Sequence, residues 1–167
     1  MNPPTTRRGL VTQPFSPADE GVIAPVLTVE RALAVSYRHV LDSGALGHHA
    51  RNVVRSSYEH ELAHVRAFGG RVASGPAAVA AAAKVLSAPA LASVHSEADC
   101  VRLLLAAEQA ALRAYFKAMS QFSSTRLLQL AAEIMASEAQ HVTLLTELLY
   151  PGDIDKAVPV PFVQGTS

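Results

Sequence analysis

An apolar stripe near the end of the sequence contains two polar residues. Between positions 127 and 149, apolar side chains recur every three or four residues, which is the period of one helix face. Glu138 and His141 lie within this stripe, and on a helix a separation of three residues directs both side chains to the same side. A carboxylate and an imidazole directed into a core are costly unless a partner there binds them. The usual partner is a metal ion.

The same pair of residues occurs earlier in the chain. Glu61 and His64 have the same spacing, and they share a helix face with apolar residues of the segment 53–68. A single Glu-x-x-His pair is also compatible with a salt bridge or with a solvated helix edge. Two such pairs on two apolar helix faces instead predict that both are directed into one common interior.

Glutamate and tyrosine residues extend this match into an internal repeat. In each half of the chain a glutamate is followed seven residues later by a tyrosine, and then by the Glu-x-x-His pair. The separation between the first and second glutamates differs by a single residue between the two halves. The repeat therefore predicts two similar helix pairs, with polar core residues at Glu30, Tyr37, Glu61 and His64 in the first pair and at Glu108, Tyr115, Glu138 and His141 in the second.

Composition and helix signals agree with this architecture. Half of the residues are hydrophobic but only 5% are aromatic, so the core must be aliphatic, which suits helices better than strands. Capping residues, glycines and prolines predict four long helices. Their predicted bounds are Pro25 to Asp42, about Gly47 to Gly69, Ser96 to about Phe122, and Ser123 or Ser124 to Tyr150.

The connections between these helices predict the topology. The short connection between the first two helices requires antiparallel neighbours, whereas the Ala-rich segment 71–95 is long enough to cross a bundle of about 30 Å. We therefore predict an all-α fold: a four-helix bundle over residues 25–150, made of two antiparallel pairs joined by a long crossover at 71–95. Residues 1–24 are predicted to form an irregular arm, and residues 151–167 an extended tail.

Charge and cysteine content exclude several classes of function. The net charge is zero and the pI is about 7.1, so we expect neither nucleic acid nor an anionic membrane as a partner. Cys100 is the only cysteine, which excludes an internal disulfide and a four-cysteine metal site. The sequence has no apolar run of about 18 residues, and its first residues do not resemble a signal peptide. We expect a cytoplasmic protein.

The charges of the repeated residues predict a dinuclear metal centre. Four glutamates carry four negative charges, which two divalent ions would balance if both histidines are neutral. Mixed carboxylate and imidazole ligands suit iron or manganese better than zinc. Glutamates that bridge two ions about 3.5–4 Å apart would make this centre capable of redox chemistry.

Four segments carry a resemblance to a known superfamily. LTVERALAVSYRHVL, YEHELAHVRAF, LLLAAEQAALRAYFKA and AAEIMASEAQHVTLL resemble the ferritin-like di-iron carboxylate superfamily, in particular its small bacterial ferritin-like domain proteins, over roughly residues 26–149. This resemblance implies a ferritin-like bundle. It also implies that Tyr37 and Tyr115 donate hydrogen bonds to liganding carboxylates, although both also fit the interpretation of amphipathic core residues. The six metal ligands that it implies are Glu30, Glu61, His64, Glu108, Glu138 and His141.

Departures from the superfamily's branches narrow the expected function. Ala111 occupies the position where rubrerythrins carry an additional glutamate, and a single cysteine cannot build their cysteine-ligated iron domain. Storage ferritins need a fifth helix to form their cage, and the tail after Tyr150 has no amphipathic pattern. We therefore expect neither a rubrerythrin-type peroxidase nor a cage, but a homodimer.

Two functions from different classes fit these observations. The first is an oxidoreductase in which a di-iron or di-manganese centre reacts with O2 or H2O2, as a ferroxidase, oxidase or catalase, and depends on an external electron donor. The alternative is a metal-binding stress or structural protein without turnover. His60 projects about 100° away from Glu61, so we expect it to be a surface residue and not a ligand.

Overall fold

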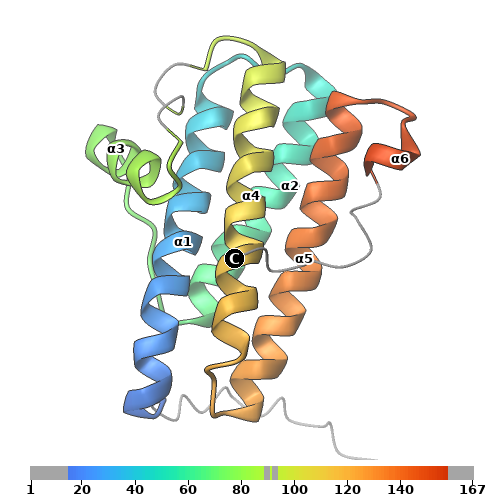
Figure 1. Ribbon diagram of the computed structural model, residues 1–167. Helices are drawn as coiled ribbons and strands as arrows, with labels where there is room; N and C mark the ends of the chain where they lie inside the picture. The colour runs from blue at the N-terminus through green and yellow to red at the C-terminus, as the bar shows by residue number, and fades with distance from the viewer. Residues whose placement is uncertain (1–14, 89–90, 92–93, 158–167) are drawn as a thin grey trace, which may run out of the picture.

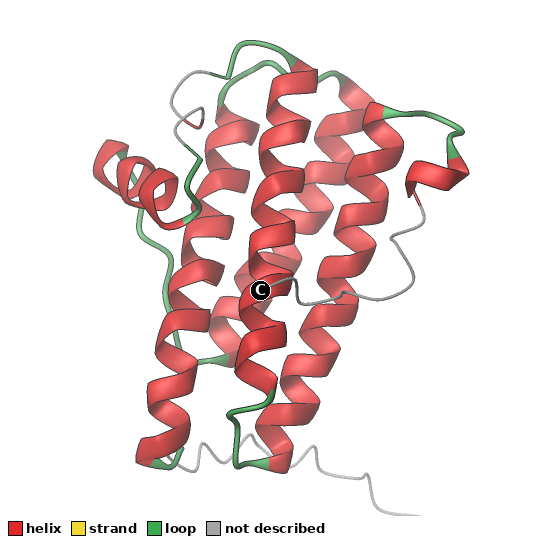
Figure 2. Ribbon diagram, viewed as in Figure 1, coloured by secondary structure: helices red, strands yellow, loops and turns green. Residues whose placement is uncertain are grey.

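Four long helices form the body of the molecule. The computed structural model describes residues 15–88, 91 and 94–157. The long helices are α1 (Pro17–Asp42), α2 (His48–Ala67), α4 (Glu97–Met119) and α5 (Thr125–Leu149), and they lie side by side in a bundle (Figure 1). Two short helices, α3 (Pro76–Val85) and α6 (Ile154–Ala157), lie on its outside. The described residues contain no strand (Figure 2), which confirms the all-α prediction.

The path of the chain follows the predicted topology. Short connections join α1 to α2 and α4 to α5, so each pair runs antiparallel (Figure 1). The segment between α2 and α4 returns along the outside of the bundle, and its helix α3 packs against α1. This segment includes the predicted crossover at 71–95, and it places the start of α4 at the same end of the bundle as the start of α2.

The first helix begins earlier than predicted. Ser16 caps α1, because its hydroxyl accepts a hydrogen bond from the Asp19 amide at 3.1 Å, and Pro17 occupies the first turn, where a missing N–H costs nothing. Pro25 lies inside the helix on an exposed face. The prediction of a start near Pro25, and of an irregular arm through residue 24, is therefore wrong for residues 17–24. Residues 1–14 of that arm lie outside the described residues.

The tail after α5 also departs from the prediction. Residues 154–157 form the short helix α6 instead of an extended segment. Asp153 explains its start, because its carboxylate accepts a hydrogen bond from the Lys156 amide at 3.2 Å, as a helix cap does. The rest of the predicted extended tail, residues 158–167, lies outside the described residues.

Polar contacts fix the two ends of the bundle. Ser96 caps α4 as predicted, and Ser124 is the residue that caps α5. Ser123 instead bonds to Asp19 of α1, through its amide at 2.8 Å and its hydroxyl at 2.9 Å. At the opposite end, the Glu97 carboxylate accepts a hydrogen bond from the Gly47 amide at 2.6 Å. Both contacts join the first helix pair to the second.

The core consists of two apolar clusters. The larger contains buried residues of α1, α2 and α4 such as Leu33, Val54 and Leu104, and the smaller contains residues such as Phe122 and Leu127. Along α1 and α5, the repeated glutamates fall where one cluster gives way to the other, and along α4 Glu108 lies within the larger cluster, one to two turns before the smaller one begins. The polar residues are therefore enclosed along the length of the bundle. None of the helices described by the structure is both long and apolar enough to span a membrane.

Candidate metal centre

The four helices bring the six predicted ligand residues together in the interior. Helices α1 and α4 each contribute one glutamate, and α2 and α5 each contribute one Glu-x-x-His pair. The four glutamates are completely buried, while His141 is 2% exposed and His64 is 8% exposed. Carboxylates are rarely buried without partners, so this cluster requires a physical explanation. Its members are Glu30, Glu61, His64, Glu108, Glu138 and His141.

These residues form two overlapping groups. Glu61 and Glu138 belong to both groups, whereas Glu30 with His64 and Glu108 with His141 each belong to one. Within each group, one ligand atom from every residue lies within 4.8 Å of the others. Such an arrangement could hold two adjacent cations that share the two carboxylates.

The two shared glutamates divide their oxygens between the histidines. Glu61 places Oε2 3.7 Å from His64 Nδ1 and Oε1 3.0 Å from His141 Nδ1. Glu138 places Oε1 3.2 Å from His64 Nδ1 and Oε2 3.1 Å from His141 Nδ1. Each carboxylate therefore offers one oxygen to each position, as a bridging ligand does.

Most acceptor atoms of the cluster lack a hydrogen bond. Both oxygens of Glu30 and Glu61, one oxygen each of Glu108 and Glu138, and His64 Nδ1 are buried without a partner of hydrogen-bond geometry in the described part of the chain. Buried polar groups in proteins are normally satisfied. His141 Nδ1 is within hydrogen-bond geometry of Glu108 Oε1 and Glu138 Oε2, both at 3.1 Å, but the atoms named above lie close to other ligand atoms without such geometry. This donor set fits cations, because a cation that lies between such oxygen and nitrogen atoms can bind several of them at once.

The pKa values show the electrostatic cost of the cluster. Burial raises the pKa of Glu30, and burial together with the charge of Glu138 raises the pKa of Glu108. Burial alone would lower the pKa of His64 and His141, but the surrounding glutamates outweigh it and raise the two values to about 12 and about 11. In the metal-free protein, the protonated imidazoles thus balance part of the negative charge of the glutamates. Metal ions that bind to the cluster would replace those protons.

Each of the two repeated tyrosines lies near the glutamate of the other helix pair. Tyr37 of α1 donates a hydrogen bond to Oε1 of Glu108 on α4. Tyr115 of α4 is buried, and its pKa is raised by burial and then by the charge of Glu30 on α1. Tyr115 Oη has no aligned acceptor among the described residues. A well-aligned hydrogen bond to a carboxylate is therefore present for Tyr37, whereas Tyr115 approaches the Glu30 carboxylate without that alignment.

One histidine outside the predicted set also contacts the cluster. His60 of α2 is exposed, as the sequence predicts, yet its Nδ1 lies 3.0 Å from His141 Nε2 on α5. The two rings meet edge to edge, with centroids 5.3 Å apart and planes 17° apart. The sequence does not reveal this contact, because the angle between His60 and Glu61 on their own helix does not determine which side chain the neighbouring helix places beside His60.

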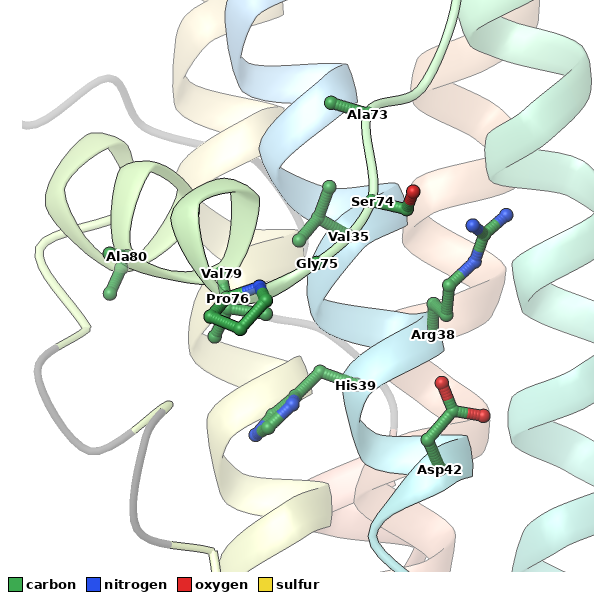
Figure 3. A pocket seen from close by; sticks show the side chains of 11 residues that line it. Val35, Arg38, His39, Asp42, Ala73, Ser74, Gly75, Pro76, Val79 and Ala80 are labelled. Carbon is green, nitrogen blue, oxygen red and sulfur yellow. The ribbon is translucent and has the colours of Figure 1, made fainter.

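A cavity of about 440 Å³ lies elsewhere, between α1 and the segment that leads into α3. Figure 3 shows Pro76 and Val79 on one side of it and Arg38, His39 and Asp42 of α1 on the other. None of the six clustered residues lines this cavity. The buried cluster and the cavity are therefore separate features.

Comparison with known proteins agrees with the bundle and its buried cluster. The ferritin-like domain family matches residues 19–151, a range that reaches from the first turn of α1 past the end of α5 and contains all six clustered residues. A search of curated proteins finds no significant match. The family match covers most of the sequence, and the chain therefore belongs to the ferritin-like domain family.

Proposed function

We propose that the protein binds two iron or manganese ions and reacts with O2 or H2O2 as an oxidoreductase. The observation that carries this proposal is the set of buried, unpaired acceptor atoms in two overlapping groups. Two divalent ions would balance the four carboxylates, and such mixed oxygen and nitrogen donors suit iron and manganese. The proposed ligands are Glu30, Glu61, His64, Glu108, Glu138 and His141.

Each ligand residue has a distinct task in this proposal. Glu61 and Glu138 would each bind both ions, because each carboxylate directs one oxygen toward His64 and the other toward His141. Glu30 and Glu108 each complete one position. Tyr37 holds the Glu108 carboxylate by a hydrogen bond. The bound ions would supply the electrons for reduction of O2 or peroxide.

The surrounding chain would control access to the centre. Apolar clusters enclose it toward both ends of the bundle, which excludes water and strengthens the electrostatic contacts inside. Repeated turnover would draw electrons from an external donor, since the chain's only cysteine, Cys100, is buried and free. We also propose a homodimer, and light scattering of the purified protein would test this: a 24-subunit particle would contradict it.

Loading with metal followed by rapid mixing tests the proposal. Purified protein is titrated with Fe²⁺ without oxygen, and the bound iron per chain is measured. The loaded protein is then mixed with O2 and, separately, with H2O2 in a stopped-flow absorbance instrument. We expect two ions per chain and oxidation faster than that of free Fe²⁺. Protein loaded with Mn²⁺ is assayed for O2 release from peroxide. A chain that binds no metal would overturn the proposal.

The alternative function is metal binding without turnover. Five of the six proposed ligands are at most 2% exposed, which favours ions that stabilise the bundle over ions that meet a substrate. Two bound ions, a raised melting temperature and no accelerated oxidation by O2 or H2O2 would support this alternative. Glu133, an exposed glutamate of α5, provides the matched control for substitution of a ligand glutamate of the same helix, such as Glu138→Gln. Glu133→Gln should bind metal as the parent does.

A further inference from the structure

We propose that His60 is a positioning residue which holds His141 in its metal-binding orientation, so that the position formed by Glu61, Glu108, Glu138 and His141 binds its ion more tightly than the other. This inference rests on the proposed dinuclear centre. It goes beyond that centre by assigning a role to a residue outside the ligand set and by making the two positions unequal.

The contact joins a surface side chain to a buried one. His60 Nδ1 lies 3.0 Å from His141 Nε2, within hydrogen-bond distance, and the two ring planes are only 17° apart, so a hydrogen bond in the ring plane restricts rotation of the buried imidazole. The opposite nitrogen, His141 Nδ1, lies 3.0–3.1 Å from oxygens of Glu61, Glu108 and Glu138. His60 thus holds the ring from the side opposite the carboxylates.

Metal binding by His141 requires one tautomer. If Nδ1 binds an ion, the ring proton must reside on Nε2, which then needs an acceptor. His60 Nδ1 provides this acceptor when the His60 proton is on its outward Nε2. A partner of this kind orients a liganding histidine and increases its basicity.

In the described part of the chain, the position that contains His64 has no side chain that acts on its histidine as His60 acts on His141. In the internal repeat Glu61 corresponds to Glu138, so the counterpart of His60 is Ser137, whose side chain is much shorter than an imidazole. Among the described residues, no comparable partner of His64 is found on the side away from the carboxylates. Tyr37 adds to the difference, because its ring meets that of His141 edge-on, with centroids 6.4 Å apart.

Stepwise metal titration tests the inference. Parent and variants are titrated with Co²⁺ without oxygen, and visible absorption and bound metal per chain are followed. His60→Ala should weaken one of the two binding steps by about tenfold or more, the usual effect of removing such a partner, and leave the other step unchanged. His60→Asn should restore most of the affinity, because Asn Oδ1 takes nearly the place of His Nδ1.

Two matched controls separate positioning from other effects. Ser137→Ala alters the counterpart position, and His49→Ala removes another exposed histidine of α2; both should titrate like the parent. The melting temperature of each metal-free variant reports on folding. As a second measurement, the Zn²⁺-loaded parent should show a slowly exchanging His141 Nε2–H in ¹⁵N-resolved NMR spectra.

Different failures identify different errors. A parent that binds no Co²⁺ would overturn the dinuclear proposal itself. A parent that binds two ions, with His60→Ala binding both at parent affinity, would overturn only the role of His60. Equal losses in His60→Ala and His60→Asn, or a His141 Nε2–H that exchanges at the solvent rate, would also overturn it.

Discussion

Tyr37 of α1 donates a hydrogen bond to the carboxylate of Glu108 on α4. The two residues belong to opposite halves of the internal repeat, and both are completely buried. The tyrosine that follows the glutamate of one helix pair thus supports the glutamate of the other pair. In the first half of the repeat, the tyrosine therefore serves the contact between the helix pairs and not a contact within its own helix.

Removing this hydroxyl should destabilise the bundle. A hydrogen bond to a carboxylate contributes about 1.5–3 kcal/mol, so Tyr37→Phe should lower the free energy of unfolding by about that amount. Tyr115→Phe is the matched control, because Tyr115 Oη has no aligned acceptor among the described residues, and it should cost less. Urea denaturation of both variants in chelator measures the difference, and an equal or larger loss for Tyr115→Phe would contradict the prediction.

The contact between Asp19 and Ser123 should make the stability of the bundle depend on pH in the acidic range. Hydrogen bonds from the Ser123 amide, and further from the hydroxyls of Ser16 and Ser123, lower the pKa of the Asp19 carboxyl. A lowered folded-state pKa stabilises the fold above the unfolded value of about 3.9, and this stabilisation is lost as the pH falls through the folded-state value.

Comparison with a neutral side chain isolates this effect. Asp19→Asn should be less stable than the parent at pH 6, and the difference should shrink as the pH falls below about 4. Urea melts over this pH range in chelator provide the measurement. Asp155→Asn, at an exposed position of α6, serves as the control. A stability difference between Asp19→Asn and the parent that persists undiminished at low pH would refute the assignment.

Helix periodicity explains which parts of the site the sequence could predict. Side chains three residues apart share a helix face whatever the surroundings, so the pairs at Glu61 and Glu138 could be identified locally, and the repeat indicated their convergence. Contacts between helices depend on helix rotation and height, which the sequence does not show. The contact of His60 with His141 is therefore not visible in the sequence. The early start of α1 is not visible either, because Pro25 fits the first turn of a helix as well as Pro17 does.

Metal binding should release protons. The pKa values of His64 and His141, about 12 and about 11, leave both imidazoles protonated at pH 7 when no metal competes. Each must lose a proton to bind an ion, so the apparent metal affinity should increase as the pH rises from 6 to 8. Calorimetric titration with Mn²⁺ in buffers of different ionisation enthalpy measures the release. An apparent enthalpy that does not change with the buffer would show that the histidines are neutral before binding.

The two overlapping groups predict a hierarchy among the glutamates. Glu138 belongs to both groups, whereas Glu30 belongs to one. Glu138→Gln, which keeps the volume but removes the charge, should therefore abolish binding of both ions, while Glu30→Gln should weaken one. Glu61→Gln should behave like Glu138→Gln, because Glu61 is the other shared carboxylate. Metal analysis after exposure to Fe²⁺ without oxygen distinguishes these outcomes.

The metal-free stability of Glu138→Gln separates a ligand from a structural ion pair. Four carboxylates enclosed together repel one another. After burial, the charge of Glu138 is the next cause that raises the pKa of Glu108, so removing this charge should hold or raise the melting temperature of the metal-free protein. A glutamate retained for a structural ion pair would behave in the opposite way, since its loss leaves a buried partner unpaired and costs stability. Two ions still bound per chain, together with a lowered metal-free melting temperature, would therefore refute the assignment of Glu138 as a bridging ligand.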